Sequence, residues 1–120
     1  MNVKAQYRPS KQTEAYNRRV GERLRTFRKL RNLEQCAVYP KLGYKSSGAG
    51  SLIEAGRRGL NKTKLRAAAA ILETYPEILT DERELSREEL ITLDAFFKIL
   101  KNPDHPKYKV LCQLLNHNAK

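Results

Sequence analysis

The sequence has few of the features that mark secreted, membrane-spanning or disulfide-linked proteins. Its two cysteines, Cys36 and Cys112, are too few and too far apart for a disulfide framework, so we interpret them as free thiols. No apolar run approaches the length of about 18 residues that spans a bilayer. The N-terminus carries charged and polar residues where a signal peptide would need an apolar core. We therefore expect a protein of the cytoplasm with no membrane partner.

Motifs for catalysis and metal binding are also missing. We find no nucleophile beside a base and no paired-carboxylate site, and the segment 48–50 lacks the strand and the lysine of a phosphate-binding glycine loop. His105, Cys112 and His117 have the chemistry of zinc ligands, but their spacing matches no zinc knuckle or finger. The sequence predicts no enzyme, no metal site and no cofactor.

Acidic residues are scarce in the first part of the chain. Residues 1–70 contain 17 Lys and Arg but only 4 acidic residues, whereas residues 71–120 contain 7 basic and 9 acidic residues. The whole chain of 120 residues carries a formal net charge of +11. This uneven distribution predicts that a polyanion such as nucleic acid meets the first half.

The apolar pattern is helical, with no strand-like alternation and no internal repeat. Four apolar residues spaced by four, three and three positions predict a helix from about Asn17, whose remaining surface is strongly basic. These four are Val20, Leu24, Phe27 and Leu30. A chain of this length suits one domain with a single core, so we predict an all-α, compact bundle of five to six helices.

Two short helical segments should follow the first helix. The apolar pattern of residues 33–42 predicts a second helix, which Pro40 should shorten or kink. Ser46 and Ser47 are N-cap candidates for a third helix that ends at Gly56. The apolar residues of this third helix are Leu52 and Ile53.

Three further helices are expected in the second half. Asn61 should begin the fourth, and Tyr75-Pro76 should end it. Ser86 and Glu89 form a capping box for the fifth, and Pro106 lies near the start of the last. We expect the apolar residues of the last two helices to be core, or alternatively a dimer surface: Phe96, Phe97, Leu100 and residues 110–115.

Two short helices joined by a tight glycine-containing turn and flanked by basic helices are typical of a helix-turn-helix. Particular residues add to this layout: Gly21, Leu24, Arg28, Leu33, Gln35, Val38, Leu42, Gly43, the run from Ile53 to Arg58, Leu65 and Leu72. On these positions, the stretch from Val20 to Leu72 resembles the Cro and phage-repressor (XRE-like) helix-turn-helix family.

The resemblance implies contacts with double-stranded DNA, position by position. Gln35 matches the glutamine at the start of the family's second helix, which bonds a phosphate and braces the recognition helix. Family members read bases from the turn and the early recognition helix, and they touch phosphates from the loop and helix start that follow. The matching residues are Lys45, Ser46, Ser47 and Ser51 for the bases, and Arg57, Arg58, Asn61 and Lys62 for the phosphates.

Three features differ from the family pattern. Tyr39 stands where the family has a small alanine against the recognition helix, Pro40 lies inside the second helix, and the segment Gly43–Ile53 carries one extra residue. Serine and glycine predominate in the expected reading helix, and they offer none of the bidentate donors that discriminate bases best. We therefore expect modest direct readout, with selectivity added by DNA shape or a second half-site.

The resemblance implies a repressor-like transcriptional regulator. We expect a flexible basic arm at 1–16, a helix-turn-helix DNA-binding core at 17–76, and a helical extension at 77–120 that covers the core or forms a homodimer. One alternative is a protein-interaction module, such as an antitoxin-like or mobile-element assembly protein with mainly non-specific DNA binding. An RNA-binding protein is disfavoured because no aromatic stacking surface is evident.

Overall fold

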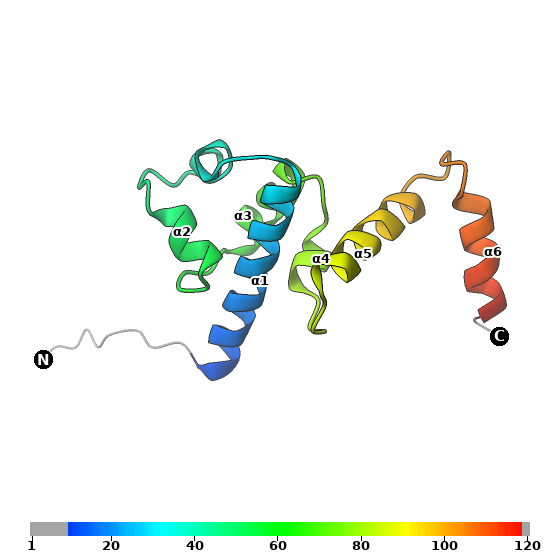
Figure 1. Cartoon of the computed structure of the whole chain (residues 1–120), viewed down its shortest axis with the longest axis horizontal. Helices are drawn as coiled ribbons and strands as arrows, with labels where there is room; N and C mark the ends of the chain where they lie inside the picture. Colours follow the sequence, from blue (N-terminus) through cyan, green and yellow to red (C-terminus); the bar gives the residue numbers. More distant parts are fainter. Residues whose placement is uncertain (1–9, 119–120) are drawn as a thin grey trace, which may run out of the picture. The chain divides into compact units, whose positions relative to one another are not determined.

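The computed structural model describes residues 10–118 of the backbone and the side chains as far as residue 116. This part of the chain has six α-helices and two short 3-10 helices and contains no strand, which confirms the all-α prediction (Figure 1). None of its helices is both long enough and apolar enough to cross a membrane. The chain divides into two units, residues 1–82 and residues 83–120, which we describe separately.

The first unit begins with its longest helix, α1 (Lys11–Leu30). Ser10 caps this helix, because its Oγ accepts a hydrogen bond from the amide of Thr13 at 3.1 Å. Asn32 ends it in the left-handed region with φ of 58°, and the next amide, of Leu33, bonds back to the last turn.

The predicted flexible arm over 1–16 is therefore wrong for residues 11–16, which form the start of α1. Residues 1–9 of the predicted arm lie outside the described residues. The buried residues of α1 begin only at Val20, so apolar periodicity carries no signal for the earlier turns. The N-cap residue Ser10 was the sequence feature that could have indicated the start of α1.

The predicted second helix consists of two 3-10 helices, η1 (Gln35–Ala37) and η2 (Tyr39–Leu42). Pro40 lies in the first turn of η2, where its missing N–H costs no hydrogen bond. Gly43 ends η2 with φ of 97°, as the sequence predicts. The proline thus divides this segment and keeps it from forming one α-helix.

Helix α2 (Ala49–Glu54) is short and has no side-chain cap. The prediction that Ser46 or Ser47 caps it is wrong, because Ser46 Oγ accepts from the amide of Gly48 at 3.2 Å and closes a local turn ahead of the helix. Gly56, with φ of 78°, ends the helix as expected.

Asn61 caps α3 (Lys62–Ile71), with its Oδ1 accepting from the amide of Lys64 at 2.8 Å, which confirms the predicted start. The helix ends before the expected stop, through Glu73 in the left-handed region with φ of 56°. Pro76 begins a further helix, α4 (Pro76–Thr80), in the position where proline is favoured.

The core of the first unit lies where α1 contacts α2 and α4. Its most deeply buried side chains are Leu24, Phe27, Val38, Ile53, Leu72, Ile78 and Leu79. Arg23 is also buried, and its Nη1 donates to the carbonyl oxygens of Ile78 at 3.0 Å and Asp81 at 2.6 Å. These bonds satisfy backbone acceptors at the end of α4, where no helical partner is available.

The second unit contains α5 (Arg87–Leu100) and α6 (Tyr108–Asn118). The predicted capping box is present, because Ser86 and Glu89 exchange hydrogen bonds at 2.8 and 3.1 Å. The prediction that the apolar residues of both helices form a core is wrong for three of them, since the following side chains are 40–57% exposed: Val110, Leu114 and Leu115.

Candidate nucleic-acid interface

Two glycines let α1 and α2 approach closely. A Cβ at Gly21 would lie 2.4 Å from the carbonyl oxygen of Ile53, and a Cβ at Gly56 would lie 2.6 Å from the Cα of Arg18. Both contacts involve backbone atoms that cannot move aside. The inner side of α2 is therefore fixed against α1, and its other side stays exposed.

A buried ion pair connects the same two helices. Arg28 donates from Nε to Glu54 Oε2 at 2.6 Å and from Nη2 to Glu54 Oε1 at 3.0 Å, a bidentate geometry. The remaining Nη1 donates to the carbonyl oxygen of Leu33 at 2.8 Å. Tyr39 also donates its hydroxyl to Glu54 Oε2 at 2.6 Å. Glu54 thereby ties α1 and η2 to α2.

Protonation follows from this arrangement. Burial raises the pKa of Glu54, but the hydrogen bonds from Arg28, Tyr39 and Gln35 together outweigh it and hold that pKa below its usual value. Burial, followed by the hydrogen bond to Glu54, raises the pKa of Tyr39. Glu54 is therefore ionised and Tyr39 neutral at physiological pH.

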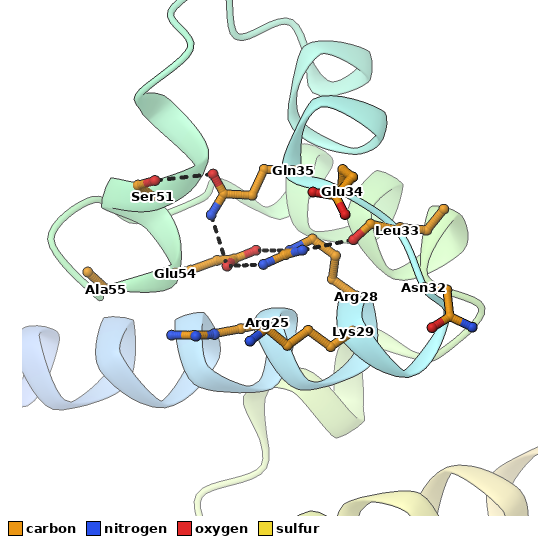
Figure 2. Close-up of a pocket in the computed structure, with 10 residues that line it drawn as sticks. All are labelled: Arg25, Arg28, Lys29, Asn32, Leu33, Glu34, Gln35, Ser51, Glu54 and Ala55. Carbon is orange, nitrogen blue, oxygen red and sulfur yellow. Dashed lines mark hydrogen bonds and ion pairs between the residues drawn. The ribbon is translucent and has the colours of Figure 1, made fainter.

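Gln35 bridges η1 and α2. Its Nε2 donates to Glu54 Oε1 at 3.2 Å, and its Oε1 accepts from Ser51 Oγ at 3.1 Å (Figure 2). These two bonds brace α2, which is half of the role that the sequence analysis gave to Gln35. A phosphate contact by Gln35 stays a prediction.

An open pocket of about 590 Å³ lies beside this bridge. Figure 2 shows the exposed side chains of Arg25 and Lys29 extending along α1 at one side of it, with Gln35 and Ser51 at the other. Glu34 lines it as well, while Glu54 is already paired with the arginine described above. The pocket is thus a polar recess with two exposed cations and one exposed carboxylate, and its cations could bind an anion such as a phosphate.

The other predicted reading residues lie on the surface ahead of α2. Lys45, Ser46 and Ser47 are exposed and line a second pocket of about 540 Å³, together with Tyr39 and Gly50. Gly50 has no side chain, and the ring of Tyr39 fills the space. A large residue at position 39 is thus accommodated by the smallest residue on the facing helix.

Two cations gather on one aromatic ring. Arg58 lies over the ring of Tyr44 with its Cζ 4.6 Å from the ring centroid, and Lys64 lies over the same ring at 4.1 Å. The ring is buried, with 8% of Tyr44 exposed. This contact draws the loop after α2 and the first turn of α3 together.

The remaining predicted phosphate residues are close to Arg58 and Lys64 in the sequence. Arg57 and Lys62 are exposed, so their charges are accessible to a ligand. Asn61 uses its Oδ1 as the cap of α3. The structure therefore brings Arg58, Lys62 and Lys64 to the same loop and helix start.

Residues 35–72 contain seven basic residues and a single acidic residue, Glu54. Because Glu54 is buried, this stretch itself contributes no exposed carboxylate side chain. The seven are Lys41, Lys45, Arg57, Arg58, Lys62, Lys64 and Arg66.

Sequence reasoning treated the arginines of the first helix as one basic surface, and the structure divides them. Arg23 and Arg28 are buried, and Arg31 donates to the carbonyl oxygens of Leu72 at 2.9 Å and Glu73 at 3.0 Å. Apart from the nearby Leu33, the partners named for these arginines lie 26 to 58 positions away in the sequence, so no local pattern signals these bonds.

Sequence reasoning also missed Tyr44 and Lys64. A tyrosine next to a glycine stop and a lysine in a first helical turn are common, and only the tertiary contact connects them. Among the side chains that the structure describes, no group of three His, Cys, Asp or Glu is placed to hold a metal ion. The side chain of His117 lies outside them. Comparison with protein-family models, curated proteins and solved structures gives no match.

Proposed function

We propose that the protein is a DNA-binding regulator that uses a helix-turn-helix, in which η1 and η2 act as the first element and α2 as the recognition helix. The observation that carries this proposal is the absence of an exposed acid between positions 35 and 72, where seven basic residues lie. A stretch with this many cations and no exposed carboxylate of its own favours a polyanion.

The phosphates are bound by the loop after α2 and the start of α3. Arg57, Arg58, Lys62 and Lys64 neutralise them, and Tyr44 holds two of these cations at a fixed place. Such contacts position the protein without reading sequence. Gln35 holds the exposed face of α2 toward the major groove, through its bonds to two residues of that helix.

Base readout by polar side chains is modest. The hydroxyl proton of Ser51 is already donated to Gln35, and Ser46 accepts from a backbone amide, so neither offers the paired donors and acceptors that identify a base pair. Lys45 remains exposed at the front of the helix. The specific affinity should therefore exceed the non-specific affinity by a ratio near the lower end of the usual range of about 10³ to 10⁷.

Selection from random duplexes tests this function. We expect an enriched motif, and we expect its affinity to fall with salt with a log–log slope of magnitude about 4–8. Binding that is unchanged between low and physiological salt would contradict the proposal. Uniform retention of all duplexes would instead favour the interaction module with non-specific DNA binding.

A second copy of the chain is the proposed partner of α6. Val110 and Leu114, four residues apart on α6, are 57% and 56% exposed. A pair of chains would also carry two recognition helices, the number needed for two half-sites one DNA turn, about 34 Å, apart.

A further inference from the structure

The exposed side of α2 contains one large apolar side chain. Leu52 is 44% exposed, whereas its neighbour Ile53 is 2% exposed. The other exposed residues of this helix and its C-cap are small, namely Ser51 and Ala55. In the described residues of the first unit, Leu52 is the only exposed large aliphatic residue.

The residues on either side of α2 in the sequence include exposed cations. Lys45 precedes the helix and Arg57 follows it, and both are exposed. Single exposed leucines are common on protein surfaces, so the exposure of Leu52 alone does not indicate a binding site. Its position on the proposed recognition helix is the stronger argument. A partner that fits here is anionic as a whole and presents an apolar group between its charges. The DNA major groove has this character, because the thymine methyl lies between two rows of phosphates.

We propose that Leu52 reads thymine through its C5 methyl group in the major groove, and so sets the strongest base preference of this helix. The inference rests on the proposed DNA-binding function. The small side chains of Ser51 and Ala55 let the helix approach the base edges closely, and the hydroxyl of Ser51 is engaged with Gln35. The contact available to Leu52 is therefore apolar, and thymine is the base that offers one.

Single thymine-to-deoxyuridine replacements in the selected duplex test the contact, because each removes one methyl group and leaves the hydrogen-bonding edges unchanged. Dissociation constants would be measured by fluorescence anisotropy at one salt concentration. We expect replacement at one thymine, or at its symmetric counterpart, to weaken binding about fourfold, as expected for one buried methyl group. In Leu52→Ala the same replacement should have no effect, while Leu52→Met should restore part of the sensitivity.

Thr92→Ala is the control, since Thr92 is an exposed residue of α5 and belongs neither to α2 nor to α6. It should keep the full response to deoxyuridine. If a motif is selected but Leu52→Ala responds to deoxyuridine as the wild type does, this inference is overturned and the DNA-binding function stands. If no duplex is bound in the selection, the proposed function itself fails, and the inference with it. Thermal unfolding of each variant checks that the fold is intact.

Discussion

The ring of Tyr39 occupies the space that a side chain at Gly50 would need. A Cβ at Gly50 would lie 2.5 Å from Cδ2 of this ring, and Tyr39 cannot withdraw easily because its hydroxyl is bonded to Glu54. The pair fixes the distance between η2 and α2. The tyrosine and the glycine, which each look unfavourable alone, thus fit together.

We expect Gly50→Ala to destabilise the protein by about 1–3 kcal/mol, the usual cost of overpacking a core. This cost exceeds the gain of up to about 1 kcal/mol that alanine brings inside a helix. Urea unfolding measures the difference. Gly48→Ala is the control, because Gly48 is exposed and a Cβ there meets nothing closer than Ser46 Oγ at 3.9 Å. A neutral or stabilising Gly50→Ala would show that Tyr39 can move.

The ion pair of Glu54 should give the stability a pH dependence. Its pKa is lower in the folded protein than the ordinary 4.5, so its stabilisation is fully present above that value and is lost as the pH falls through the folded-state pKa. We expect Glu54→Gln to lose about 3 kcal/mol near pH 7, because Arg28 stays buried without its partner.

The stability difference between wild type and Glu54→Gln should shrink as the pH is lowered below 4.5, which urea unfolding at a series of pH values measures. Glu22→Gln, at an exposed site on α1, should change stability by less than about 0.5 kcal/mol. A difference that stays constant from pH 7 to pH 3 would argue against an ionised Glu54 in the folded state.

Two glycines with positive φ should respond differently to alanine. Gly43 has φ of 97°, and a Cβ there would meet no atom within 4 Å, so Gly43→Ala should cost only the backbone strain of about 1 kcal/mol. Gly56→Ala adds a collision with the Cα of Arg18 at 2.6 Å and should cost clearly more. Thermal unfolding compares the two, and equal losses would show that α1 and α2 can separate freely.

Substitution of the cations on Tyr44 should weaken DNA binding without changing base preference. Arg58→Gln and Lys64→Gln should each lower the affinity for selected and scrambled duplexes similarly, and each should reduce the magnitude of the salt slope by about one. Lys109→Gln, in the second unit, is the control and should leave both quantities unchanged. A change confined to base preference would mean that these side chains enter a groove.

A charge on α6 should prevent pairing of two chains. We expect Leu114→Asp to convert a dimer to a monomer and to weaken binding to a two-half-site duplex while leaving a single half-site unaffected. Sedimentation and titration of both duplexes measure this, and Lys109→Gln serves again as the control. A wild-type protein that is monomeric at high concentration would contradict the proposed second copy.

The sequence by itself determined most of the helices and several of their ends, because these depend on local chemistry. Four predicted helix ends agree with the structure. They are the N-cap at Asn61, the capping box of Ser86 with Glu89, and the glycine C-termini at Gly43 and Gly56. Charge distribution is likewise a property of sequence. It indicated the basic half without any structure.

Only the tertiary structure decided which apolar residues and which arginines are exposed to a partner. Leu52 and Ile53 are adjacent apolar residues of one helix, yet only the second is buried, because a helix turns neighbouring side chains about 100° apart and α1 covers one side. Arg28 looks like the other arginines of α1, but Glu54, 26 positions away, lies where it can be paired. Such long-range pairings depend on how the helices pack, and no local pattern records them.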